Sequence, residues 1–416
     1  MGRWPRLLII AFITYSLAYL DRVNYGFGAA AGLADSLHIS PYVASALGAT
    51  FFLGYFAFQI PGGYYASQRS AKRLVFWGLL LWGVCASATG LIANIPLLFV
   101  DRFVLGVVES MVLPAMIVFL SNWFTRGERS RANTVLILGN PVTVLWASIV
   151  SGYLISWIGW RGMFVAEGIP SVVWAFVWLA LAQDSPADAR WLPEAERAEL
   201  LGRLTAEQRA LPAIPSLGAA LRLPSVIMLS AQYLFWSLGV YGFVLWLPSM
   251  VKVGLQQGIV ATGWLSSIPY AAAVIAMLVV SAYADRTGNR RIVVAISMFV
   301  AAAAFYVSYL AGPAQFQVAY AALIVAGAAI YAPYGPFFAM ITDLVPRSAA
   351  GAATAMINSF GALGGFVGTY LVGYLNALTG TASASFSLLA ASLLIAGILT
   401  VLVRVQRESD VAPTPA

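Results

Sequence analysis

Charge, cysteine and histidine are scarce in this sequence of 416 residues. Only 9% of the residues are charged, 61% are hydrophobic, and the mean hydropathy is +0.84. These values exclude an ordinary soluble globular protein and are typical of a protein that crosses a membrane several times. The single cysteine, Cys85, excludes disulfide bridges within the chain and metal sites built from cysteine.

The one histidine, His38, lies between the first two hydrophobic runs. Catalytic and metal sites are built from histidine, cysteine or clustered acids, and no buried pair of acids on one predicted helix suggests a metal site. The sequence therefore predicts no metal and no resident cofactor. It argues against a membrane-embedded enzyme such as an acyl or glycosyl transferase.

Hydrophobic runs long enough to cross a bilayer as helices fill most of the chain. We count about twelve of them, at residues 7–33, 42–65, 74–94, 96–122, 132–157, 162–183, 225–251, 262–283, 292–311, 315–341, 350–377 and 382–403. The first run carries internal charge and has no small-residue cleavage site, so we interpret it as a retained helix rather than a signal peptide. The predicted fold class is an all-α integral membrane protein.

Basic residues indicate the orientation, because Lys and Arg stay on the cytoplasmic side of short loops. All but four of the 23 basic residues fall at the termini or in the even-numbered connections. The exceptions are Arg22 and Arg102 within spans, and Arg161 and Lys252 at the opposite loops or span ends. We expect a multi-pass protein of the cell's inner (plasma) membrane with both termini in the cytoplasm. Loop basicity also explains the net charge of +7 without a nucleic acid partner.

A polar stretch divides the chain into two similar parts. Residues 184–222 contain eleven charged residues and predict a cytoplasmic linker, within which residues 191–197 resemble a surface helix. Six-helix halves then occupy 1–183 and 223–405, and 406–416 form a cytoplasmic tail. At an offset of 218 residues, and without gaps, the matching positions are Lys72 and Arg290, Arg73 and Arg291, Arg129 and Arg347, and Asn140 and Asn358. Such internal symmetry is expected of many secondary transporters.

Charged residues inside the spans are the strongest functional signal. Asp21 and Arg22 lie near the middle of the first run, where one charge costs about 2.5 to 3.5 kcal/mol. Arg102 and Glu109 share one face of the fourth span, two turns apart. Asp21 and Glu109 are predicted to be the only deep acids of the first half and to carry coupling protons. The alternative, a structural ion pair of either acid with Arg22 or Arg102, stays open.

Arg22 keeps its proton and presents a planar fork suited to a carboxylate, so it predicts an anionic substrate. Tyr15 and Tyr19 lie on the same stripe of span one, and Tyr55 and Gln59 form a stripe on span two. Hydroxyl groups beside a fixed cation suit a small hydroxylated acid, although packing or interfacial tyrosines are the simpler interpretation of each ring. Further polar candidates of the same kind are Asn140, Tyr241 and Asn358.

Two cytoplasmic loops at the 218 offset differ in one respect. Residues 285–291 after span eight include Asp285, Arg286, Gly288 and Arg290, whereas residues 67–73 after span two keep the basic end but begin with Ser67. An aspartate at a helix end can hold a neighbouring helix N-terminus through charge and dipole, which forms a latch that breaks when the cytoplasmic side opens. We predict a working latch in the second loop and a weakened one in the first.

Nearly the whole chain resembles the major facilitator superfamily, and within it the anion:cation symporter family, which includes bacterial sugar-acid carriers. Residues 285–291 resemble the superfamily's signature loop, and residues 19–24, 61–63, 128–132, 357–359 and 364–368 are similar to the family's own motifs. The resemblance implies twelve helices in two pseudo-symmetric six-helix halves, and it implies a monomer.

The resemblance to galactonate-type carriers also implies roles for individual residues. Asp21 and Glu109 match the protonatable acids, and Arg22 matches the arginine that binds the substrate carboxylate. The positions that match polar cavity residues are Tyr19, Tyr55, Asn140 and Asn358. Departures from the pattern are Ser67 in the first loop, Ser110 and Met111 after Glu109, and Phe337 and Phe338 in span ten. These departures favour a different or less hydroxylated acid.

The pattern as a whole predicts a proton-coupled symporter in the bilayer that imports a small organic anion, such as a sugar acid or other carboxylate, by alternating access. Protons are the only coupling agent expected. The main alternative is a proton antiporter that exports hydrophobic compounds, whose cavity we expect to lack a central arginine. A channel is disfavoured because the two-fold repeat and the polar midplane suit alternating access.

Overall fold

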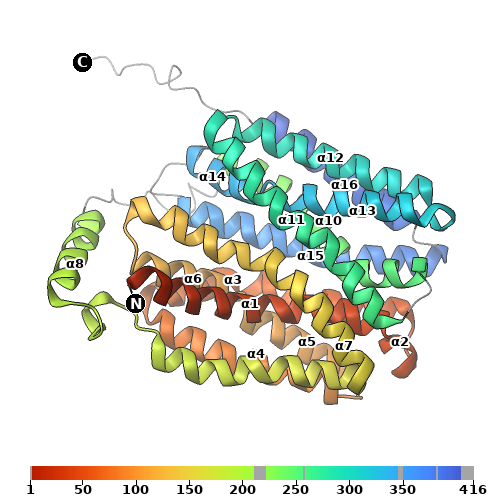
Figure 1. Ribbon diagram of the computed structural model, residues 1–416, viewed down its shortest axis with the longest axis horizontal. Coiled ribbons are helices and arrows are strands. Elements are labelled where there is room, and N and C mark those ends of the chain that lie inside the picture. Colours follow the sequence, from red (N-terminus) through yellow and green to blue (C-terminus); the bar gives the residue numbers. More distant parts are fainter. Residues whose placement is uncertain (1, 210–221, 256–257, 345–349, 381–382, 404–416) are drawn as a thin grey trace.

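The computed structural model describes residues 2–209, 222–255, 258–344, 350–380 and 383–403, and every regular element in these ranges is a helix. Figure 1 shows the helices as a bundle whose long members run side by side. The α-helices are α1 (Arg3–Ala30), α2 (Leu33–Ser36), α3 (Pro41–Gln68), α4 (Ala71–Leu91), α5 (Ile95–Ser110), α6 (Val112–Ser121), α7 (Arg126–Leu181), α8 (Glu194–Arg209), α10 (Pro224–Leu255), α11 (Ile259–Thr287), α12 (Arg290–Ala311), α13 (Phe316–Tyr331), α14 (Tyr334–Leu344), α15 (Ala350–Thr379) and α16 (Ser383–Leu402).

The described residues include eleven helices that are long and apolar enough to cross a membrane. One of them, α7, has 56 residues and is broken at Gly159, whose φ of 70° is not helical. A bilayer needs only about 20 helical residues, so α7 crosses twice and the described residues make twelve passes. The prediction of an all-helical membrane protein with twelve spans is confirmed.

Two of the twelve passes are each made of two helices. The fourth pass is α5 followed by α6, and Pro114 shortly after the break has no N–H to offer Ser110. The tenth pass is α13 followed by α14, with Pro333 at the break. Elsewhere the apolar runs begin at polar caps, since the side chains of Ser40 and Asn94 accept hydrogen bonds from the first turns of α3 and α5.

Helix packing repeats between the two halves. In the first half α1 packs on α7, and in the second α10 packs on α15 in the same way. The halves meet where α3 packs on α15 and α7 packs on α11. The helix α3 begins at Pro41 and α11 begins at Ile259, which reproduces the offset of 218 residues seen in the sequence.

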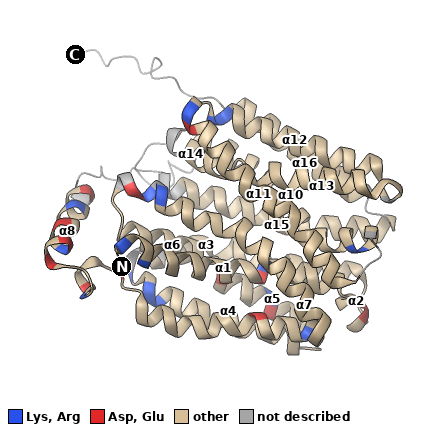
Figure 2. Ribbon diagram, viewed as in Figure 1, with Lys and Arg blue, Asp and Glu red and all other residues tan. Residues whose placement is uncertain are grey.

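One end of the molecule collects most of the basic residues, as Figure 2 shows. The start of α1 and the helix α8 both lie at this end in Figure 1, and Arg3 donates a hydrogen bond to the carbonyl of Trp123 at 3.1 Å. Arg291 at the start of α12 donates to the carbonyl of Val403 at 2.9 Å, which places the end of α16 there too. The described parts of the predicted even-numbered connections that these contacts involve therefore share one face of the bundle.

The linker is only partly a solvated segment. Its predicted surface helix begins at Glu194 rather than at residue 191, and Trp191 instead stacks on Trp123 with ring centroids 5.6 Å apart. Trp191 Nε1 also donates to Gln183 Oε1 at 2.9 Å. The reason is apolar surface, because Leu192 is buried in the hydrophobic core. Residues 210–221 of the linker and the tail at 406–416 lie outside the described residues.

Candidate functional site

A buried ion pair lies where α1 crosses α5. Arg22 Nε donates to Glu109 Oε1 at 2.7 Å, and the two side chains are 4% and 0% exposed. Burying both charges is costly, and removing one partner of such a pair typically costs about 3 to 5 kcal/mol because the other charge is left without compensation. Any group that displaces Glu109 from Arg22 must therefore bring its own negative charge or neutralise Glu109.

Aromatic rings surround the Arg22 guanidinium. Its central carbon lies 4.5 Å from the ring centroid of Tyr55 and 5.2 Å from that of Tyr19. The faces of these rings stabilise a cation after it has lost water. Both tyrosines, predicted as substrate residues, thus meet at the arginine.

Close packing of α3 on α5 places Tyr55 at the pair. A Cβ atom on Gly106 would collide with the carbonyl oxygen of Phe51, and one on Gly54 would collide with that of Phe103. Without side chains at these two positions the helix backbones approach closely, as small residues allow in membrane proteins. The approach brings the α3 tyrosine within reach of residues on α5 and α1.

Asp21 is adjacent to Arg22 but belongs to a different set of contacts. Its Oδ1 accepts a hydrogen bond from Asn24 Nδ2 at 3.3 Å, and the residue is 0% exposed. Successive residues on a helix point about 100° apart, which separates Asp21 from the Arg22 and Glu109 pair. Asp21 Oδ2 and Glu109 Oε2 have no hydrogen-bond partner among the described residues. Each acid therefore keeps one acceptor atom open.

Arg102 lies deeper than a helix-end residue. It is 2% exposed, and its guanidinium carbon is 4.8 Å from the ring centroid of Tyr25 and 5.4 Å from that of Phe51. Neighbouring Asp101 accepts a hydrogen bond from the Thr89 hydroxyl at 2.7 Å. Arg102 is therefore covered by residues of α1 and α3 and does not only pack the end of the span.

A third deep acid, Glu167, was missed by the sequence reasoning. It is 3% exposed, and its Oε1 accepts a hydrogen bond from the Ser151 hydroxyl at 2.7 Å. The prediction that Asp21 and Glu109 are the only deep acids of the first half is therefore wrong. The available signal was an acid several residues inside the predicted span 162–183, with the same isolation as Glu109.

The remaining predicted polar residues approach the site from other helices. Asn140 on α7 is buried and lies beside Tyr15, while Tyr241 on α10 packs against Phe52 with ring centroids 4.5 Å apart. Asn358 on α15 is half-buried. Next to it, the Ser359 hydroxyl donates to Gln59 Oε1 at 3.3 Å across the two halves. Both halves thus contribute polar side chains around α1.

The predicted latch is a local contact. Arg290 Nη2 at the start of α12 lies 3.6 Å from Asp285 Oδ1, and Gly288 between them has a φ of 68°, which favours glycine. Asp285 is 70% exposed, and exposed ion pairs contribute little stability. Arg286 is also exposed. The side chain of Ser67 and the residue Arg347 lie outside the described residues.

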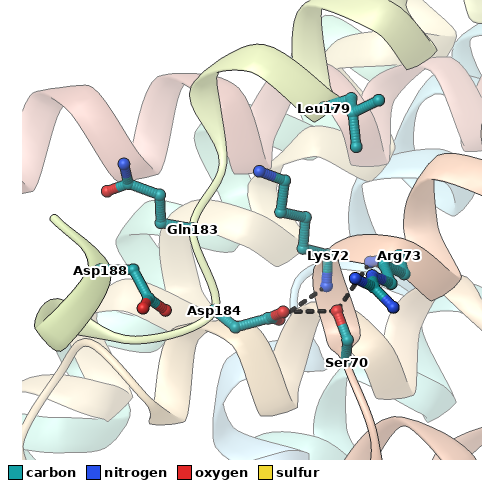
Figure 3. Close-up of a pocket in the computed structure, with 7 residues that line it drawn as sticks. All are labelled: Ser70, Lys72, Arg73, Leu179, Gln183, Asp184 and Asp188. Atoms are coloured by element: carbon teal, nitrogen blue, oxygen red, sulfur yellow. Dashed lines mark hydrogen bonds between the residues drawn. The ribbon is translucent and has the colours of Figure 1, made fainter.

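In the first half, where residue 67 is a serine, Asp184 reaches the N-terminus of α4, the helix that follows the loop at residues 67–73. The carboxylate of Asp184 accepts a hydrogen bond from the Ser70 hydroxyl, and another from the backbone N–H of Lys72 at 2.8 Å. Figure 3 shows these contacts beside a cavity of about 320 Å³ lined also by Arg73, Gln183 and Asp188. A carboxylate thus caps the N-terminus of α4, as expected from the helix dipole, although residue 67 cannot provide it.

The described residues hold no cluster of three or more His, Cys, Asp or Glu side chains that could bind a metal ion. What the central arrangement offers is a buried guanidinium, carboxyl groups with open oxygens, and tyrosines from both halves. Such a set can exchange protons and a carboxylate, and it holds no group placed for covalent chemistry.

Comparisons with known proteins bear on the family and the fold of the chain. The family model of the Major Facilitator Superfamily matches residues 11–369 and 259–416. An Agrobacterium vitis protein named "Putative tartrate transporter" is 31% identical over 405 residues, covering 95% of this chain and 89% of that protein. The inner membrane transport protein RhmT of Escherichia coli is 31% identical over 427 residues, covering 98% and 96%.

Two further similarities bear on function and fold. The quinolone resistance transporter of Acinetobacter baumannii is 29% identical over 426 residues, covering 98% of this chain and 95% of that protein. A crystal structure of a bacterial homologue of the human lysosomal transporter Spinster, inward-facing and occupied, superposes with a TM-score of 0.73. Its sequence identity is 15%, and the match covers 97% of this chain and 96% of that one, so the likeness shows the fold.

Proposed function

Because the chain belongs to the Major Facilitator Superfamily, we propose that it is a proton-coupled symporter that imports a small organic anion such as a sugar acid or a related carboxylate. That the chain is a transporter rather than an enzyme follows from its relatives, whose names describe transporters of anions and metabolites. The observation that carries the proposal is the buried Arg22 and Glu109 pair beside Asp21.

The pair supplies a simple coupling rule. While Glu109 is ionised it occupies Arg22, and a substrate carboxylate would have to compete with it inside a low-dielectric site. A proton on Glu109 removes the competing charge, and the guanidinium can then bind the carboxylate through its planar fork. Anion and proton therefore bind together, and loss of the proton on the other side restores the pair and expels the anion.

Tyrosines from both halves complete the proposed substrate site. Tyr19 and Tyr55 lie against Arg22, and Tyr15 and Tyr241 lie nearby. Their hydroxyl groups suit the hydroxyls or ring of a small acid, with Asn140 and Asn358 as further partners. We place the basic end of the bundle in the cytoplasm, with both termini, and the working unit as a monomer in the plasma membrane.

The first experiment is a thermal-shift screen of the purified protein against tartrate, galactonate, aromatic acids and simple dicarboxylates. We expect one class to raise the melting temperature of the wild type but not of Arg22→Ala. If Arg22→Ala responds as the wild type does, the carboxylate binds elsewhere and the proposed site is wrong.

The coupling rule predicts the behaviour of Glu109→Gln in proteoliposomes. The amide keeps a similar shape but cannot carry the proton, so a pH gradient should no longer drive accumulation, while exchange of anion for anion is partly retained. Glu199→Gln, on the exposed face of α8, is the matched control and should accumulate the anion normally. If Glu109→Gln still accumulates the anion in response to a pH difference, the proposed coupling is wrong.

Export by proton antiport is the second candidate, since the Acinetobacter baumannii relative is a quinolone resistance transporter. The buried arginine favours an anionic substrate instead, because a site for neutral hydrophobic compounds gains nothing from a desolvated cation. Expression in a drug-sensitive strain distinguishes the two, since only an exporter raises resistance across a panel that includes quinolones.

A further inference from the structure

Glu167 lies outside the proposed coupling pair and has no role in it. The residue belongs to the second pass of α7, after the break at Gly159, and it is 3% exposed. Its hydrogen bond from Ser151, which belongs to the first pass, joins the two passes across that break at 2.7 Å. Ser151 precedes Gly152, which packs against Gly263 of α11 in the other half. Glu167 is thus tied to an interface between the halves.

The partners of Glu167 differ from those of Glu109. The groups that contact its carboxyl are the Ser151 hydroxyl and the Asn24 amide, and Oε2 has no hydrogen-bond partner of good geometry among the described residues. Arg22 pairs with Glu109, and Arg102 lies over Tyr25. A buried carboxylate without a cation is costly, and a glutamine could accept the same hydrogen bond from Ser151 without that cost. An acid at this position indicates a use for its proton.

Asn24 connects Glu167 to Asp21. The amide donates to Asp21 Oδ1 at 3.3 Å, and the same amide lies beside the carboxyl of Glu167. Asp21 Oδ2 and Glu167 Oε2 are the open atoms of the two acids. Other charged or titratable groups near this cluster are Tyr25 on α1, Asp101, Arg102 and Glu109 on α5, and Cys85 on α4. Two carboxyl groups thus lie beside one amide, and among the described residues Arg102 is the cation nearest to Asp21 that does not pair with Glu109.

We propose that Glu167 is a further proton site of the transporter, which exchanges its proton with Asp21 across the Asn24 amide. In the step, the O–H bond on Glu167 breaks and one forms on Asp21, with a water at the amide as carrier. Asp21 then gives its proton to water on one side of the membrane, and Glu167 takes its next proton from water on the other side. The buried acids Asp21, Asp101, Glu109 and Glu167 outnumber the buried bases Arg22 and Arg102. Full ionisation would therefore leave two uncompensated negative charges, which protons can balance.

The proposal deepens the proposed symport and rests on it for its transport readout. In proteoliposomes, the tartrate gradient that just balances a fixed pH gradient and membrane potential reports the number of protons moved with each anion. We expect Glu167→Gln to move one proton fewer per anion than the wild type. The Glu199→Gln control should keep the wild-type ratio. An unchanged ratio in Glu167→Gln would overturn the proposal.

A second readout needs no substrate, so it separates this proposal from failure of the proposed function. Infrared difference spectra of the purified protein, recorded as the pH is stepped, contain the C=O stretching band of each carboxylic acid that gains or loses a proton. We expect Glu167→Gln to lose one such band. Spectra identical to those of the wild type would show that Glu167 does not titrate and only holds α7 together.

Ser151→Ala covers the case in which Glu167→Gln does not fold. It keeps the acid but removes its hydroxyl donor, so the Glu167 band should remain and change frequency, whereas a band that is unmoved contradicts the assignment.

Asn24→Ala removes the amide that lies beside both acids and should slow proton exchange between them, visible as a lower transport rate at an unchanged proton ratio. Transport at the wild-type rate by Asn24→Ala would show that the amide takes no part in proton exchange between Glu167 and Asp21.

Discussion

At the scale of single residues, the guanidinium of Arg22 combines two properties that lysine lacks. Its Nε is engaged by Glu109 at 2.7 Å, while the rest of the planar fork lies over Tyr55. A lysine would keep the charge but would offer one compact ammonium group. The arginine can therefore hold its carboxylate in one orientation, which a point charge cannot do.

Arg22→Lys should lower anion affinity by more than a model based on charge alone allows. Losing one hydrogen bond between charged groups costs about 1.5 to 3 kcal/mol, or roughly ten- to a hundred-fold in the dissociation constant. Calorimetric titration with the anion found in the thermal-shift screen measures the change. Arg102→Lys is the control, because Arg102 is equally buried but does not contact Glu109. Equal losses in the two variants would mean that the fork of Arg22 has no special part.

Sequence reasoning identified the deep charges but could not say which of them pair. Asp21, Arg22 and Glu109 stand out because a charge inside an apolar run is costly wherever the helix faces. Which acid meets Arg22 depends on the rotation and crossing of α1 and α5, and residues 22 and 109 are 87 positions apart. Glu167 belongs to none of the motifs that resemble the family, so its only signal in the sequence was an isolated acid inside an apolar run.

At the scale of helices, the crossing of α3 and α5 depends on glycine rather than on side-chain contacts. Gly106 faces the carbonyl oxygen of Phe51, and that atom belongs to backbone which cannot turn aside as a flexible side chain would. The apolar runs predicted both helices, since length and hydropathy are local features. Their closeness was not predictable, because it depends on where two distant glycines meet.

Gly106→Ala should therefore destabilise the protein. Overpacking of this kind typically costs about 1 to 3 kcal/mol, and here it also moves Tyr55 relative to Arg22. The matched control is Gly202→Ala on α8, where a new Cβ meets nothing within 4 Å and where the better helix propensity of alanine should be neutral or stabilising. Thermal unfolding in detergent compares the two. A melting temperature unchanged in Gly106→Ala would show that the helices can separate slightly without loss.

At the scale of the whole molecule, contacts between the halves gather at the end away from α8. Lys252 Nζ donates to the carbonyl oxygen of Ala30 at 2.6 Å, where the end of the α1 dipole favours a cation. The hydroxyls of Tyr42 on α3 and Tyr370 on α15 are 2.6 Å apart. The repeat and the basic loops in the sequence predicted two halves and the basic face that they share. They did not predict the end of the bundle at which the halves touch, because the same sequence must support every conformation of the proposed transport cycle.

Locking that end should stop transport. A Cβ atom on Gly373 of α15 would overlap the side chain of Ser45 on α3, so the pair Ser45→Cys and Gly373→Cys, made with Cys85→Ala, should form a disulfide once the two helices have moved slightly apart. Alternating access requires these helices to part, so oxidation should abolish anion uptake and a reductant should restore it.

The matched control for the disulfide uses the same residue types within one half. Gly168 on α7 also faces the Ser87 side chain on α4, although there a new Cβ atom would meet backbone atoms of Ser87 and Gly83 as well, and both helices belong to the first half. If the halves move as rigid bodies, a disulfide formed in the pair Ser87→Cys and Gly168→Cys should leave uptake unchanged. Uptake at the wild-type rate by a fully oxidised Ser45→Cys and Gly373→Cys protein would mean that the halves do not separate there. Inhibition by both disulfides would place the motion within the first half instead.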